Sequence, residues 1–119
     1  MKKFISIFAI LVATTSCSLF NSVTSNTTIT PQNSFVLGNN EHGSFSVKLK
    51  NVSKNEVVVH RSPNAGGNHS YVTVQPNETV KVKVEKNTSL VIENKTADTA
   101  SVNLYIKGDT GLSMGYKNS

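Results

Sequence analysis

The amino-acid sequence predicts an all-β fold, a small antiparallel β-sandwich of about seven strands. From Phe35 onward, hydrophobic residues recur at every second position, which is the periodicity of strands with one buried face. Short segments rich in Asn, Asp, Gly and Pro separate these runs. No segment after residue 17 carries a helical stripe of apolar residues, and 119 residues suffice for one small domain.

Each expected strand has its own pattern. Some segments alternate aliphatic residues with Lys, Ser or Asn, and others are short runs of β-branched residues, which favour strands. The expected strands lie at residues 45–50, 57–59, 71–74, 80–85, 90–92, 102–107 and 112–116. The expected turns lie at residues 52–55, 75–78, 86–88, 96–99 and 108–111.

A short pattern occurs twice along the chain. Residues 49–53 and 92–96 share the order aliphatic-x-Asn-x-Ser/Thr before the next strand. This pattern resembles a hairpin signature of immunoglobulin-like β-sandwich modules. Local turn chemistry accounts for it equally well.

The composition excludes several classes of protein. The chain has 37% hydrophobic and 16% charged residues, no Trp and a single Cys, and Ser, Thr and Asn supply about a third of it. A coiled coil needs more charge, and a disulfide scaffold needs paired cysteines. We therefore expect a small, valine-rich core with no room for an interior active site.

The amino-terminal residues form a targeting segment. Lys2 and Lys3 precede an apolar run over residues 4–13, which is too short to span a bilayer as a stable helix. Small residues at 14–16 then lead to Cys17. The segment resembles a bacterial lipoprotein signal peptide with the loose lipobox of Bacteroidetes, although Thr14 stands where leucine is usual. The resemblance implies that residues 1–16 are a signal helix that is removed and that Cys17 carries fatty acyl chains such as palmitate.

We interpret residues 17–34 as the lipidated Cys and a flexible tether, and residues 35–119 as the β-sandwich domain. The tether segment is polar and lacks sustained periodicity, so it buries too little apolar surface to order itself. Seventeen flexible residues reach roughly 20–25 Å on average. Surface-exposed Bacteroidetes lipoproteins often carry acidic residues just after the cysteine, and none follows Cys17 closely. The resemblance therefore implies a membrane-anchored, periplasm-facing location in preference to the cell surface.

The loop over residues 60–69 is a candidate binding site, because it is longer than a hairpin requires and long loops carry function. Its candidate binding residues are His60, Arg61, Asn64, Asn68 and His69. A metal site would need His60 and His69 on one face together with a third ligand such as His42. A one-residue shift in register would separate the two histidines, so no metal ligand is assigned.

Lysines form a second candidate site. Lys48, Lys50, Lys81 and Lys83 all occupy outward-facing positions on two expected strands. If these strands are neighbours, the lysines form a basic stripe suited to anionic lipid headgroups, lipopolysaccharide phosphates or an acidic protein. The alternative is that they keep strand edges soluble. Nucleic acid is not an expected partner, because no aromatic stacking platform accompanies the lysines.

We expect no enzymatic activity, no cofactor and no catalytic residue. The sequence lacks the metalloprotease, nucleophile-elbow and phosphate-loop motifs. One further feature is a modification site: the triplet around Thr99 resembles the Asp-Ser/Thr-small acceptor of Bacteroidetes O-glycosylation.

The sequence thus predicts a small, non-catalytic lipoprotein of the bacterial cell envelope, whose β-sandwich binds an envelope partner. Two alternatives stay open. The protein is an accessory or structural subunit that assembles through an edge strand, or a ligand or metal carrier that uses the 60–69 loop.

Overall fold

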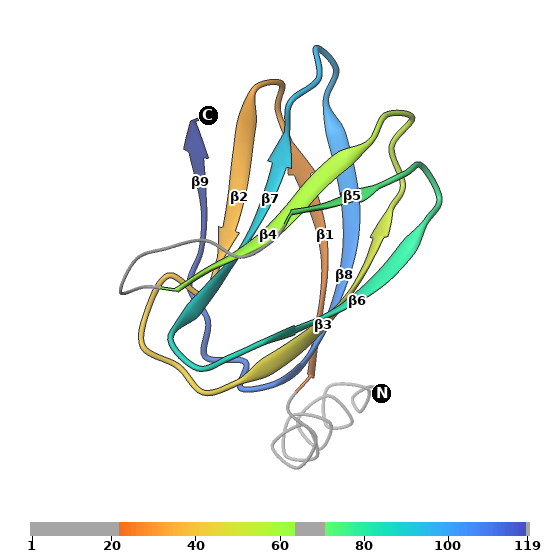
Figure 1. Ribbon diagram of the computed structural model, residues 1–119. Helices are drawn as coiled ribbons and strands as arrows, with labels where there is room; N and C mark the ends of the chain where they lie inside the picture. The colour runs from red at the N-terminus through yellow and green to blue at the C-terminus, as the bar shows by residue number, and fades with distance from the viewer. Residues whose placement is uncertain (1–21, 64–70, 119) are drawn as a thin grey trace, which may run out of the picture.

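A computed structural model of the chain describes residues 22–63 and 71–118, which form two antiparallel β-sheets packed face to face (Figure 1). The expected signal helix, Cys17 and residues 64–70 lie outside the described residues. Within the described ranges no helix has the length and apolar character needed to cross a membrane. The predicted all-β sandwich is confirmed, with nine strands in these ranges where about seven were expected.

The first sheet has four strands, in the spatial order β1 (Ser22–Ile29), β8 (Ala100–Gly108), β3 (Phe45–Asn51) and β6 (Thr79–Val84). The second sheet has five strands, in the order β5 (Val72–Val74), β4 (Val57–Pro63), β7 (Thr88–Asn94), β2 (Asn33–Leu37) and β9 (Met114–Asn118).

The pairing of strands identifies the topology. β1 pairs with β8, β2 with β7, β3 with β6 and β4 with β5. A long antiparallel hairpin wound around a core leaves this pattern, and the pairs β3–β8 and β4–β7 complete the two sheets. The eight strands therefore form a jelly roll, which β9 extends beyond β2.

This topology differs from that of immunoglobulin domains. In those domains the first two strands of the chain lie side by side in one sheet. Here β1 and β2 belong to different sheets (Figure 1). The immunoglobulin-like resemblance of the repeated Asn pattern therefore does not extend to the strand order.

The core consists of the inward-facing residues of both sheets. On β3, Phe45, Val47 and Leu49 are buried, and Lys48 and Lys50, on the other face of the strand, are exposed. Valine, leucine and isoleucine dominate this core, and Phe35 and Phe45 are its aromatic members. The expected small, valine-rich core is what the two sheets enclose.

The expectation that residues 18–34 form a flexible tether is wrong for residues 22–34, which the structure describes. Residues 22–29 pair with β8 along their whole length, and residues 33 and 34 begin β2. The inward-facing positions of β1 carry Thr27 and Ile29, which are 5% and 0% exposed. Two hydroxyl side chains on this strand, Ser25 and Thr27, bond to each other at 3.0 Å. Their polarity hides the strand from a hydrophobicity pattern, and only residues 18–21 are left between Cys17 and the first strand.

Candidate functional site

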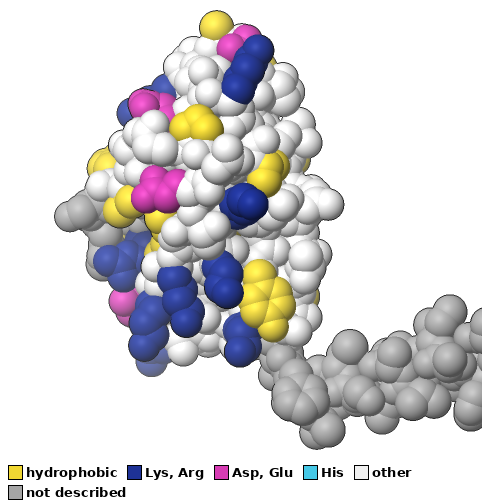
Figure 2. Space-filling view, turned by 90° about the vertical axis from the view of Figure 1, so that its right-hand side faces the viewer, with side chains coloured by type: hydrophobic (Ala, Val, Ile, Leu, Met, Phe, Trp, Pro, Cys, Tyr) yellow, Lys and Arg dark blue, Asp and Glu magenta, His cyan; other side chains and the backbone are white. Residues whose placement is uncertain are grey.

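The outer face of the four-stranded sheet is strongly basic. Strands β1, β3, β6 and β8 together contain five lysines and no Asp or Glu. All five side chains are exposed and point away from the core. They form, together with the 40% exposed Tyr105, what we call the lysine face: Lys48, Lys50, Lys81, Lys83, Lys107 and Tyr105. Figure 2 shows Lys and Arg side chains gathered in the lower half of the surface it presents.

The strand register fixes the neighbours within this face. β3 and β6 are paired, as the basic stripe inferred from the sequence requires, and Lys48 lies directly opposite Lys81. On the other side Lys48 lies opposite Tyr105 of β8. Like charges directly opposite each other destabilise a sheet, so this arrangement opposes folding and does not support it.

The lysine face is concentrated at one end of the sheet. One row of cross-strand neighbours runs Ser22, Lys107, Ser46 and Lys83 from β1 to β6. The basic end is therefore the end where β1 begins. The loops that contain Asn55, Gln75 and Asp98 lie at the opposite end.

An open, shallow hollow of about 470 Å³ lies at this basic end. Its lining residues are Ser44, Phe45, Ser46, Lys83, Val84, Glu85, Lys107 and Gly108. The small side chain of Ser46 lies between the two lysines of the row. Gly108 has a φ of +108°, and a Cβ there would lie 2.9 Å from the Ser44 carbonyl oxygen, so a larger residue would disturb this wall.

Arg61 belongs to the edge of this region. From β4 it reaches across to the other sheet, where Nη1 donates to the Lys83 carbonyl at 3.1 Å and to Glu85 Oε2 at 3.2 Å. The guanidinium therefore ties the two sheets together and offsets the charge of the carboxylate beside the hollow. The sequence-based hypothesis placed Arg61 in a binding loop, whereas here it makes structural contacts.

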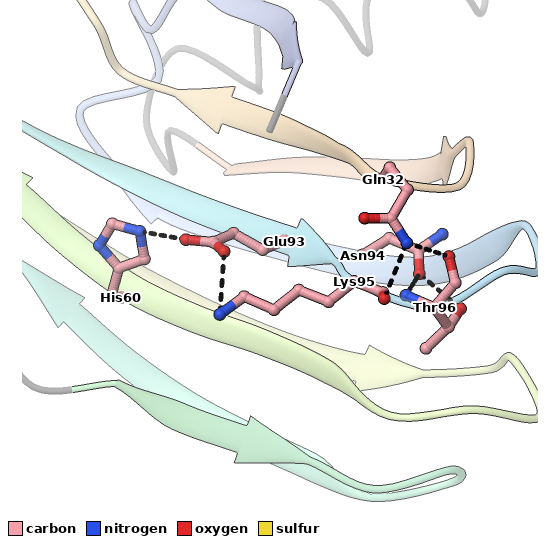
Figure 3. A network of polar contacts seen from close by, with 6 residues as sticks. All are labelled: Gln32, His60, Glu93, Asn94, Lys95 and Thr96. Carbon is pink, nitrogen blue, oxygen red and sulfur yellow. Dashed lines mark hydrogen bonds and ion pairs between the residues drawn. The ribbon is translucent and has the colours of Figure 1, made fainter.

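His60 lies on the opposite, outer face of the five-stranded sheet (Figure 3). Its Nε2 lies 2.8 Å from Glu93 Oε2, and Lys95 Nζ lies 3.6 Å from the other carboxylate oxygen. The imidazole packs against the ring of Tyr71, with ring centroids 4.3 Å apart. The side chain is only 8% exposed, which makes this cluster a packed surface contact.

The register of β4 bears on the two-histidine hypothesis. Val59 pairs with Val72, and continuing that register places Tyr71 beside His60, in agreement with the contact of their rings. Three candidate loop residues, Asn64, Asn68 and His69, lie outside the described residues. Their binding role stays a prediction.

His42, the proposed third metal ligand, is held by the backbone. Its Nδ1 lies 2.5 Å from the Gly43 carbonyl oxygen and its Nε2 lies 2.9 Å from that of Thr88. Both ring nitrogens are thus engaged by the protein. Across residues 22–63 and 71–118 no group of three potential metal ligands comes together.

Asp109 anchors the same corner of the molecule. Its carboxylate accepts hydrogen bonds from the amides of Gly43 at 2.5 Å and Gly111 at 2.9 Å. These two bonds, with a smaller contribution from the nearby His42, lower the pKa of Asp109 below its ordinary value of 3.8.

Thr99 is exposed in the loop before β8, and the carboxylate of its neighbour Asp98 accepts a bond from Asn55 at 2.8 Å. This loop lies at the end of the sheet that is opposite the basic end of the lysine face. Glycosylation of Thr99 stays a prediction.

Sequence reasoning missed two members of the lysine face, Lys107 and Tyr105. Both occupy outward positions in the alternating segment 102–107, which was a visible signal. What the sequence did not reveal is that β8 lies between β1 and β3.

The fold defines the protein as a small jelly-roll β-sandwich with one basic face. No protein-family model matches the sequence, and no curated protein matches it. Among solved structures, the chain is similar to the crystal structure of PirA, with a TM-score of 0.56 and 15% identity over 70% of this chain and 92% of that one. It is also similar to the Yersinia pseudotuberculosis-derived mitogen, with a TM-score of 0.48 and 16% identity over 79% of this chain and 95% of that one. The likeness to PirA supports the β fold.

Proposed function

We propose that this protein is a non-catalytic envelope lipoprotein whose lysine face docks on an anionic membrane surface. The observation that carries the proposal is a four-stranded sheet with five lysines and no acidic residue. A solubilising surface normally mixes both signs of charge, whereas a face of one sign attracts an oppositely charged partner.

The opposed lysines support a functional role for this face. Lys48 and Lys81 are direct cross-strand neighbours, an arrangement that costs stability. The same sheet has Thr79 and Asn103 beside Lys50, so polar uncharged residues are compatible with these outward positions. A partner that supplies negative charge would relieve the repulsion.

The start of β1 determines which end of the lysine face an amino-terminal anchor would hold near a membrane. β1 begins at Ser22, in the same cross-strand row as Lys107 and Lys83. Four residues, 18–21, separate Cys17 from Ser22, so their Cα atoms are five residue steps apart, and a fully extended chain of five steps spans at most about 18 Å. An acylated Cys17 would therefore hold the basic end of the sandwich close to the bilayer, where a polybasic patch adds about 1 kcal/mol per lysine.

Metabolic labelling tests the anchor. We expect a palmitate analogue to label the wild-type chain in its bacterial host and to leave Cys17→Ala unlabelled. An unlabelled wild type would refute the anchor.

Vesicle co-sedimentation tests the lysine face. In a Cys17→Ala background, the full chain is mixed with phosphatidylcholine vesicles with or without phosphatidylglycerol, and the apolar segment 4–13 is common to every variant. We expect vesicles with phosphatidylglycerol to bind the chain more tightly than those without. The double variant Lys48→Gln/Lys81→Gln should bind the anionic vesicles about tenfold more weakly or worse, because each lysine contributes about 1 kcal/mol.

The matched control is Lys54→Gln/Lys117→Gln, which removes the same charge outside the lysine face. We expect it to bind like the parent chain, and 0.5 M salt to weaken the binding of both. Equal losses in the two double variants would show that net charge, and not this face, governs binding.

Among the described strands, β1 lies at an edge of its sheet, and this position favours a second candidate function, assembly through an edge strand. β1 has eight residues without charge or proline and an unbroken register with β8, so it lacks the usual protection of an edge. If this edge pairs with another chain, Thr28→Lys should abolish the assembly seen by light scattering, and Ser101→Lys on the neighbouring strand should not. A monomeric wild type would exclude self-assembly.

A further inference from the structure

We infer that the hollow at the basic end of the lysine face binds a lipid headgroup that ends in a phosphomonoester, in preference to a phosphodiester headgroup. This inference deepens the proposed function, on which it rests, by naming the lipid chemistry that the face recognises.

The geometry of one cross-strand row carries the inference. Ser46 on β3 has Lys83 of β6 as its partner on one side and Lys107 of β8 on the other. Directly opposed residues in a sheet have Cβ atoms about 4.5–5.5 Å apart, so the two lysines flank the small residue and their flexible side chains can both reach a group bound over its hydroxyl. All three residues line the hollow.

The charges around the hollow are compatible with a dianion. Glu85 is the one carboxylate among its lining residues, and Arg61 Nη1 contacts it at 3.2 Å. Lys48 and Lys81 lie in the next row of the same face. The net field over Ser46 is therefore positive.

The donor set matches a terminal phosphate. A phosphomonoester carries between about 1.5 and 2 negative charges at pH 7 and has three free oxygens. Two ammonium groups and a hydroxyl can each donate to one of these oxygens. A phosphodiester such as phosphatidylglycerol has one negative charge and two free oxygens, so it offers the two ammonium groups and the hydroxyl less charge and fewer acceptor oxygens.

The test compares two vesicles of equal surface charge. The full-length Cys17→Ala chain is titrated with phosphatidylcholine vesicles that contain either phosphatidic acid or phosphatidylglycerol, matched by zeta potential. We expect several-fold tighter binding to the phosphatidic acid vesicles. Ser46→Ala and Lys107→Gln should remove this preference.

Lys50→Gln is the matched control, because it removes one charge from the same face away from the hollow. It should weaken binding to both vesicles equally and keep the preference. Thermal melts of each variant establish that the fold is retained.

The outcomes separate the two claims. Binding to both vesicles without preference, or a preference that survives Ser46→Ala and Lys107→Gln, overturns the phosphomonoester site and leaves the proposed function standing. Binding to neither vesicle above the phosphatidylcholine baseline overturns the proposed function itself. Micromolar, saturable binding of soluble glycerol 3-phosphate would instead assign the hollow to a free phosphomonoester and contradict a lipid occupant.

Discussion

Two asparagines illustrate how single residues hold the loops of this sandwich. Asn51 and Asn94 end β3 and β7, and both are completely buried. Asn51 Nδ2 donates to the carbonyls of Asn55 and Val74 at 2.8 and 3.0 Å, and its Oδ1 accepts from the amide of Ser53 at 2.9 Å.

Asn94 makes the equivalent contacts in the other sheet. Its Nδ2 donates to the carbonyls of Asp98 and Ile29 at 2.7 and 3.0 Å. Its Oδ1 accepts from the amide of Thr96 at 3.0 Å (Figure 3). The repeated sequence pattern thus corresponds to two turns that are held by a buried Asn side chain in the same way. In each turn, the Asn side chain bonds to backbone groups of its own turn and also to a carbonyl of a strand that is distant in the sequence.

We predict that Asn94→Ala strongly destabilises the protein. The substitution leaves buried carbonyl groups without donors, which costs about 1–3 kcal/mol of unfolding free energy. Urea denaturation should show a clearly lower midpoint. Asn103→Ala, at an exposed position on β8, is the control, and equal midpoints for the two variants would contradict the buried role of Asn94.

The carboxylate of Asp109 makes stability depend on pH. Because its pKa is lowered in the folded state, the stability it contributes is present above pH 3.8 and is lost as the pH falls through the folded-state pKa. Amide shifts of Gly43 and Gly111 should titrate with a midpoint below 3.8.

The matched variant for this residue is Asp109→Asn, which removes the titrating group. We expect its stability to fall less between pH 4 and pH 2 than that of the wild type. An identical acid dependence of the two proteins would show that Asp109 does not contribute.

At the scale of elements, seven strands could be predicted and two, β1 and β2, could not. The seven segments expected as strands all contain observed strands, because each has aliphatic residues at every second position. β1 was missed because Ser25 and Thr27 occupy inward positions that the pattern needs to be apolar. Residues 22–29 are ordered because they pair with β8, and the composition of this segment does not predict that pairing.

Ile29 provides the test of β1 as part of the fold. We predict that Ile29→Ala lowers the free energy of unfolding by about 2–5 kcal/mol, since this side chain is fully buried. Thr28→Ala, next to it and exposed, should change little. If residues 22–34 were a tether, both substitutions would be silent.

At the scale of the whole molecule, strand order was beyond the reach of the sequence. Alternation shows which residues of a strand face the core, and so it indicates outward positions for all five lysines, although only four were selected as candidate site residues. It does not show which strands are neighbours, because a jelly roll pairs segments that are far apart in the chain. The basic face becomes continuous only when β6, β3 and β8 lie side by side.

The lysine face also predicts a trade-off between stability and binding. Lys81→Gln removes one member of the opposed pair and should raise the free energy of unfolding by about 0.2–1 kcal/mol. The same variant should bind anionic vesicles more weakly. A destabilised Lys81→Gln would show that the lysine supports the fold instead.

The orientation of the sandwich on a bilayer tests the central claim most directly. With the acylated chain on vesicles that contain phosphatidylglycerol and a nitroxide-labelled lipid, paramagnetic broadening reports how close each amide lies to the membrane. We predict strong broadening at Ser46, Lys83 and Lys107 and little at Asn55 and Thr99, on the opposite end. Uniform weak broadening, or broadening strongest around Thr99, would contradict docking through the lysine face.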